Sequence, residues 1–133
     1  MLILSNSTNQ LVPPGQALTF DTEILHTGCC ECHEPGSGSA TLRRSHAFYE
    51  INVSGNIGAT TAGPAELTIY ANGAPVSKTT MISTTAAADD LNSVAKTRLI
   101  ATCCGAKTLS IVNTGTTDVT VDTNILFSIR HVI

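Results

Sequence analysis

Charged and large aromatic side chains are scarce in this chain of 133 residues. Asp, Glu, Lys and Arg together make up 13% of it, against about 25% in ordinary soluble domains. Aromatic residues make up 4%, and tryptophan is absent. A net charge of −3 gives little repulsion between molecules, so a weakly charged surface is a solubility liability for a lone monomer. We therefore expect a homo-oligomer in which other copies of the chain cover much of this surface.

Two classes of partner lack their usual signals in the sequence. The seven Lys and Arg residues are scattered, apart from Arg43 and Arg44, so the basic footprint of nucleic-acid binding is missing. No apolar run approaches the roughly 18 residues that a membrane span needs. Residues 1–6 have neither a basic leader nor a long apolar stretch, so they do not resemble a secretory signal. We expect the protein to be made in a reducing cytoplasm, with no nucleic-acid or membrane partner.

The chain is rich in period-two alternation. Residues 48–54, 66–71, 108–112 and 124–133 place an apolar residue at every second position, which is typical of strands with one buried face. Asn72-Gly73 lies between two such segments, and Asn-Gly favours a type I′ hairpin turn. Short strands separated by turn residues indicate a sandwich or a barrel.

We predict an all-β fold, a two-sheet antiparallel jelly-roll sandwich of about ten short strands. Residues 1–10 are expected to form an arm or an edge strand, and residues 11–133 a single jelly-roll domain. Residues 17–20 are a brief strand candidate, and residues 55–64, rich in Gly, Thr and Ala, are predicted to be a loop. An immunoglobulin-like sandwich is the alternative, but its buried Trp and paired-Cys spacing are missing.

The cysteines form the one candidate metal site. Cys29 and Cys32 have C-x-x-C spacing, His33 adds an imidazole, and Cys103 belongs to a distant cysteine pair, which is the ligand set of a structural zinc ion. Adjacent strand residues point to opposite faces, so only one member of that pair could reach a shared ion. Two alternatives stay open: reduced thiols acting as small apolar residues, or disulfides that leave one of five cysteines unpaired or bridged to another chain.

No catalytic arrangement is recognisable in the sequence. His26, His33, His46 and His131 are far apart and match no metalloenzyme motif, and residues 36–39 are not a nucleophile elbow. We therefore expect a protein that is not an enzyme and that uses no cofactor apart from the candidate zinc ion.

Several segments carry a resemblance to a known family. They are the cysteine-rich loop from Gly28 onward, followed by residues 34–38, 41–43, 49–57, 67–76, 103–104, 109–114 and 119–129. With these segments the chain resembles small proteins encoded by phages and prophages of Firmicutes, of the capsid-decoration or head-fibre type. The pattern Tyr49-x-Ile51-x-Val53, an Asn-Gly hairpin and a final apolar strand is also similar to the C-terminal domains of collagen-like spore-surface proteins.

Those C-terminal domains are jelly rolls of the tumour-necrosis-factor type that form tight trimers. The resemblance thus implies a homotrimer in a phage virion, in contact with capsid or other virion proteins. In such jelly rolls the outer face of one sheet lies at the subunit contact, which makes Leu126, Ser128 and Arg130 candidate interface residues. The alternative function is a receptor- or carbohydrate-binding module at a phage tail or cell surface. Such a module normally shows exposed aromatic platforms, and the only tyrosines are Tyr49, expected in the core, and Tyr70.

Overall fold

The computed structural model describes residues 1–28, 30–103 and 105–133. These residues form thirteen strands and no helix, and every strand pairing is antiparallel. Within this part of the chain there is accordingly no helix that could cross a membrane. The predicted all-β sandwich is confirmed, with three more strands than the ten or so expected.

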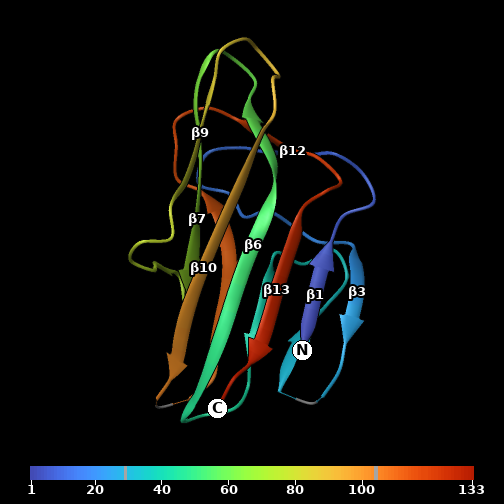
Figure 1. The fold of residues 1–133 in the computed structure, drawn as a ribbon, viewed down its shortest axis with the longest axis vertical. Coiled ribbons are helices and arrows are strands. Elements are labelled where there is room, and N and C mark those ends of the chain that lie inside the picture. Colours follow the sequence, from blue (N-terminus) through green and yellow to red (C-terminus); the bar gives the residue numbers. More distant parts are fainter. Residues whose placement is uncertain (29, 104) are drawn as a thin grey trace.

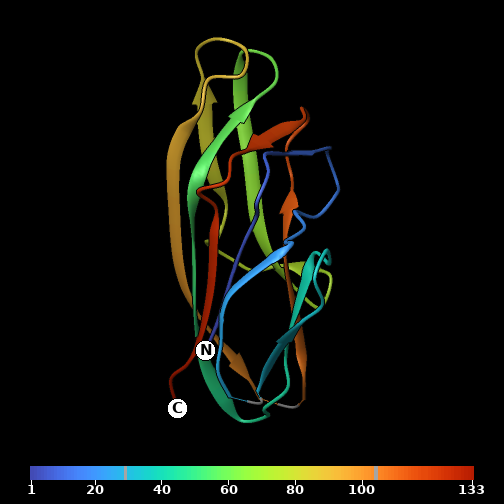
Figure 2. The same cartoon turned by 90° about the vertical axis from the view of Figure 1, so that its right-hand side faces the viewer.

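Two sheets form the layers of the sandwich, as Figures 1 and 2 show. Sheet A contains, in spatial order, β2 (Gln10–Val12), β12 (Val119–Val121), β6 (Ala47–Ala59), β13 (Leu126–His131), β1 (Leu2–Ser5) and β3 (Thr22–His26), and β10 (Asn92–Thr102) pairs with the other edge of β6. Sheet B contains β4 (Glu31–His33), β5 (Ser39–Leu42), β11 (Lys107–Asn113), β7 (Gly63–Ala71) and β8 (Ala74–Pro75), and β9 (Met81–Thr85) also pairs with β7.

The core fills the space between the sheets because the strands alternate as the sequence predicts. On β6 the side chains of Tyr49, Ile51 and Val53 are buried, and Phe127 on β13 packs against Phe20 with 5.5 Å between ring centroids. Sheet B contributes its own inner face to the same cluster, namely Ala40, Leu42, Ala65, Leu67, Ile69, Leu109 and Ile111. Burying side chains of this size contributes about 1.5–3 kcal/mol each, so this cluster stabilises the fold.

The hairpin predicted at Asn72-Gly73 is confirmed. These two residues join β7 to β8, with Ala71 paired to Ala74, and their φ angles are 51° and 79°. Positive φ at both central residues is the requirement of a type I′ turn. The Asn72 side chain also accepts a hydrogen bond from the Thr108 N–H at 2.9 Å, which ties the turn to β11.

The N-terminal segment differs from the expected arm or edge strand. β1 lies inside sheet A, between β13 and β3, and Leu2 and Leu4 are fully buried. Within residues 1–10, only Gln10 belongs to an edge strand, since β2 begins there. The alternation of Leu2 and Leu4 predicts a strand with one buried face, which the structure has. It does not predict that β1 pairs on both edges, because β13 and β3, its two neighbours, come from later parts of the chain.

The predicted loop over residues 55–64 is largely strand. β6 continues through Gly55 and Gly58 to Ala59, because at these two positions another segment approaches the backbone. A Cβ at Gly58 would lie 2.0 Å from the Asp90 carbonyl oxygen, and one at Gly55 would lie 2.9 Å from Ile125 Cδ1. Glycine in a strand often marks such a close approach rather than a turn.

Replacing Gly58 with alanine should destabilise the protein by about 2 kcal/mol or more, because a new Cβ overpacks against backbone that has no rotamer to yield. The matched control is Gly115→Ala, whose Cβ would lie 3.3 Å from Glu66 Cβ. Urea unfolding followed by circular dichroism measures both variants. Equal midpoints for the two variants would show that the Gly58 contact does not constrain the fold.

Two aspartates fasten loops to the sandwich. The Asp21 carboxylate accepts hydrogen bonds from the Ser7 hydroxyl at 2.7 Å and the Ser7 N–H at 2.9 Å, and these bonds with that of Thr22 lower its pKa. Partial burial by itself would raise the pKa of Asp122, but hydrogen bonds from Asn56 and Asn124 outweigh it and hold the pKa below the usual value.

These directions predict acid lability with a definite sign. A carboxylate whose pKa is lower in the folded state stabilises the fold above its unfolded pKa of about 3.9 and loses that contribution as pH falls through the folded pKa. Asp122→Asn should therefore lower the urea midpoint of unfolding at pH 7. At pH 3 the difference in midpoint between this variant and the unmodified protein should be smaller. Asp90→Asn, at an exposed loop carboxylate, is the control. A gap of constant size at both pH values would contradict this assignment.

Candidate functional site

The three predicted interface residues lie together on one surface. Leu126, Ser128 and Arg130 alternate along β13 with the buried residues Ile125, Phe127 and Ile129, so their side chains belong to the outer face of sheet A. The predicted division of this strand into inner and outer positions is confirmed. Figure 1 views sheet A, with β10, β6, β13, β1 and β3 side by side.

The strand registers define the outer face of sheet A row by row. One row contains Leu25, Ile3, Ser128, Asn52 and Thr97 on five successive strands. The neighbouring rows are Arg130, Glu50 and Leu99 on one side, and Leu126, Ser54 and Ala95 on the other; Phe48 faces Ala101 beyond the Arg130 row.

Exposed apolar side chains concentrate on the strands of sheet A. Among the described residues ten large apolar side chains are exposed; six belong to strands of sheet A and one, Ile82, to a strand of sheet B. At the β10 end of sheet A, Leu99 is 53% and Phe48 is 49% exposed. At the β3 end, Leu25 is 40% exposed and Leu126 is 39% exposed. Exposed apolar side chains that gather on one part of a surface often mark a protein–protein contact.

Polar side chains that bond to one another separate these two apolar regions. Arg130 donates to the Glu50 carboxylate at 3.3 Å, and the Asn52 amide donates to the same carboxylate at 3.2 Å. Thr97 in turn donates to the Asn52 side-chain oxygen. Covering this centre with another protein would therefore not strand an unpaired charge, which is the costly case in an interface.

A groove of about 490 Å³ lies beside the unpaired edge of β10. Phe48, Leu99 and Ala101 line it from sheet A, and Val76 lines it from the segment after β8. Arg98 crosses the gap between the sheets and donates to the Ser77 carbonyl oxygen at 3.2 Å. Charged side chains on an edge strand discourage pairing with a strand of another molecule. Another protein could therefore pack its side chains into the groove, but it is less able to add a strand to the edge of β10.

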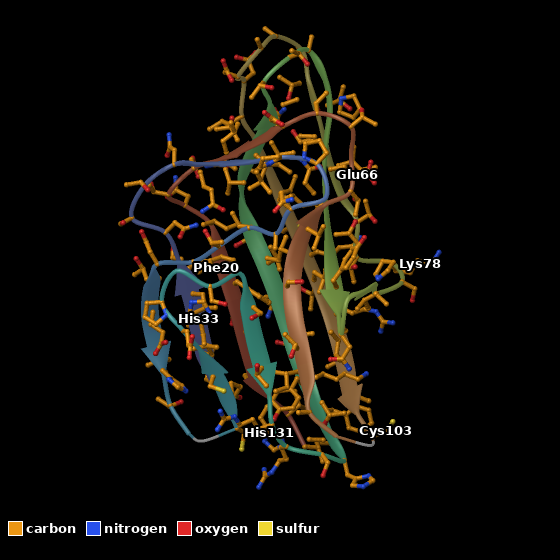
Figure 3. All side chains as sticks on the ribbon, turned by 180° about the vertical axis from the view of Figure 1, so that it is seen from behind. Phe20, His33, Glu66, Lys78, Cys103 and His131 are labelled. Carbon is orange, nitrogen blue, oxygen red and sulfur yellow. The ribbon has the colours of Figure 1, made fainter. Side chains whose placement is uncertain are left out.

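The candidate zinc ligands are not brought together in the part of the chain that the structure describes. Cys32 and His33 are neighbours on β4, whereas Cys103 follows β10 on the other side of the molecule (Figure 3). Cys29 lies outside the described residues. Among residues 1–28, 30–103 and 105–133, no three His, Cys, Asp or Glu side chains form a group that could hold a metal ion.

His33 has a structural role instead. Its Nδ1 lies 3.0 Å from the Ser39 carbonyl oxygen and its Nε2 lies 3.0 Å from the Phe20 carbonyl oxygen, and its ring meets the edge of the Phe20 ring. Figure 3 shows the two labelled side chains next to each other. With both ring nitrogens against carbonyl oxygens, the imidazole fastens the β4–β5 hairpin to the segment before β3 and is not positioned to bind an ion.

The buried polar groups at the end of the sandwich where β6 begins are also parts of the packing. Tyr49 is fully buried, as predicted, and its ring contacts that of His131 with 5.4 Å between centroids. Burial, with the nearby Cys30 and Glu31, raises the pKa of Tyr49, so the phenol stays neutral at physiological pH. A neutral, enclosed phenol with an imidazole against its ring provides no nucleophile that a substrate could reach.

The sequence-based prediction covers only one strand of this surface, β13. Phe48 and Leu99 were missed, although the buried partner Tyr49 next to Phe48 already implies an outward Phe48 by alternation. Leu25 could not have been placed, because the register of β3 against β1 shifts between Ile3 and Leu4. A bulge of this kind has no reliable signal in the sequence.

Comparison with known proteins identifies the fold. No protein-family model and no curated protein matches the chain by sequence. The globular domain of zebrafish complement 1qA protein superposes with a TM-score of 0.70, at 11% identity over 99% of this chain and 96% of that one. Eiger TNF from S. frugiperda superposes with a TM-score of 0.70, at 10% identity over 99% and 91%. PRD1 vertex protein P5 gives a TM-score of 0.52, at 15% identity over 99% and 94%.

Identities this low establish shape and nothing further. The two-sheet antiparallel sandwich described above is shared over nearly the full length with the complement 1qA globular domain and with Eiger TNF. The chain therefore has the jelly-roll fold of the tumour-necrosis-factor and C1q type.

Proposed function

We propose that this protein is a non-enzymatic structural component of a phage virion, a homotrimeric capsid-decoration or head-fibre protein. The observation that carries the proposal is the uneven distribution of exposed apolar side chains, which gather on sheet A and nearly avoid sheet B. The phage assignment rests on the sequence resemblance, and it is supported by the shared fold of a PRD1 vertex protein. Fold alone does not fix function, so the oligomer and the virion role need separate tests.

The arrangement of the apolar regions favours a closed ring over a simple dimer. One region, Phe48, Leu99 and Ala101, lies at the β10 side of sheet A, and the other, Ile3, Leu25 and Leu126, lies at the β13–β1–β3 side. Two different patches on opposite sides of one surface join head to tail, and head-to-tail contacts form a ring when the rotation between successive copies closes. A trimer is the ring that the resemblance implies.

Charge supports the same pairing. The β10 edge carries Lys96 and Arg98, whose side chains lie on the inner side of the strand because they alternate with Thr97 and Leu99, and Lys107 lies at the groove. At the opposite edge, β3 and the residue before it carry Glu23 and Asp21. Opposite charges on the two surfaces would orient one copy against the next and speed their encounter. The occupant of the β10 groove in this proposal is a second copy of the chain, through its β13–β1–β3 side.

Charge introduced into either apolar region should separate the copies. We expect the unmodified protein to have the mass of three chains in size-exclusion chromatography with light scattering, and Leu99→Asp and Leu126→Asp to elute as folded monomers. Ile82→Asp, at a position on sheet B that is more exposed than either Leu99 or Leu126, should leave the trimer intact. If the unmodified protein is a monomer, the proposed trimer is wrong. If both sheet A variants remain trimers, the proposed contact through sheet A is wrong.

The virion role is tested by location. Antibody labelling of particles released from the host bacterium should place the protein on phage heads in electron micrographs. Label on tail tips would move the assignment to the receptor-binding alternative, and particles without label would refute a virion protein of either kind.

A further inference from the structure

The outer face of sheet B carries hydroxyl groups in two different states. Around Thr68 they bond to one another: Thr68 and Thr80 are 3.0 Å apart, Thr68 and Thr114 are 2.9 Å apart, and Thr114 donates to Glu66 at 3.0 Å. Toward the β4–β5 hairpin the hydroxyls differ, since those of Thr41, Thr108, Ser110 and Tyr70 make no side-chain hydrogen bond within the described residues. This second group is available to a ligand.

The register places these hydroxyls in two adjacent rows, together with Ser39, whose hydroxyl bonds to that of Ser37, and with the Cys32 thiol. Ser39, Ser110 and Tyr70 face one another across β5, β11 and β7, and Cys32, Thr41 and Thr108 do so across β4, β5 and β11. Strands are about 4.8 Å apart, so each row extends for roughly 10 Å. Each row is longer than a single sugar ring, and the row of Ser39 and Ser110 includes the half-buried ring of Tyr70.

A hollow of about 360 Å³ adjoins the rows at the β4–β5 hairpin. Ser39 and Thr41 line it together with Glu34 and Arg43. The side chains of Glu34 and Arg43 have no hydrogen-bond or ion-pair partner in the part of the chain that the structure describes. One accepts and the other donates, and their charges cancel. His33 keeps the hollow in shape, because it holds Ser39 and Phe20 through their carbonyl oxygens.

We propose that this surface, made of Tyr70, Ser110, Ser39, Thr41, Glu34 and Arg43, binds a neutral polysaccharide chain. Hydroxyls that both donate and accept, a carboxylate and a guanidinium match the hydroxyl groups of a sugar, and the Tyr70 ring offers an apolar face with a polar tip. A polyanion meets Glu34 and finds only one cation, and an apolar peptide finds no apolar pocket here. The length of the rows selects a chain over a single sugar.

This site is independent of the proposed trimer. It lies on sheet B, whereas the proposed contact lies on sheet A, on the other layer of the sandwich (Figure 2). A monomer would keep the site, and a trimer without it would still assemble. Binding and oligomeric state can therefore fail separately.

Affinity electrophoresis tests the site. Native gels containing hydroxyethyl cellulose, yeast mannan, galactomannan or arabinoxylan are compared with gels without polymer and with gels containing polygalacturonate as the anionic control. We expect at least one neutral polymer to slow the protein. Thr41→Val should weaken that retardation about fivefold, the effect of one neutral hydrogen bond, and Tyr70→Ala should weaken it at least as much. Thr84→Val, on the same outer face at β9, should leave it unchanged.

Three results would overturn the proposal. They are migration unaffected by every neutral polymer, equal retardation by polygalacturonate, or full retardation of both the Thr41 and Tyr70 variants. The same variants examined by light scattering give the oligomeric state, so a loss of retardation with unchanged mass is assigned to the surface of sheet B and not to assembly.

Discussion

The register of β6 determines which side chains of sheet A enter the core and which are exposed on its outer face. The strand pairs with β10 on one edge and with β13 and β12 on the other, so three strands take their alignment from it. Its inner positions bury Tyr49, Ile51 and Val53, and its outer positions present Phe48, Glu50 and Asn52. A shift of one residue would exchange these two sets entirely. The apolar inner set fixes the register, and the register in turn decides which side chains another molecule can meet.

The composition of the two outer faces explains why the chain contains few charged residues. On sheet A, exposed apolar side chains flank a centre in which Arg130, Glu50 and Asn52 satisfy one another. On sheet B, the outer face is rich in Thr and Ser hydroxyls, which can bond to water without carrying charge. Hydrogen bonds with water can thus keep sheet B hydrated, while the exposed apolar side chains of sheet A suit the contact between copies that we propose.

Alternation made the fold readable from the sequence, and the failures have identifiable causes. The strands at 48–54 and 108–112 and the Asn72-Gly73 turn follow from local chemistry alone. The sequence predicts Gly55 and Gly58 to be loop residues, whereas they lie in β6. Glycine is needed there because Ile125 and Asp90, which are far along the chain, approach the backbone. Residues 17–20 bury Leu18 and Phe20 as a strand would, yet form only one bridge, Ala17 with Val112. The separation of Cys103 from His33 is a property of topology, which spacing between cysteines cannot encode.

The two surfaces have a joint consequence for binding strength. A single hydroxyl-lined site on sheet B would bind a neutral sugar chain weakly, because each new hydrogen bond replaces one made with water. A ring closed through sheet A would carry three such sites on its exterior, since sheet B is the opposite layer of each copy. Once one site is occupied, the others meet a repeating polymer at a high effective concentration, and avidity can exceed single-site affinity by about 10²–10⁴. Assembly through one face would thereby make weak recognition by the other face sufficient.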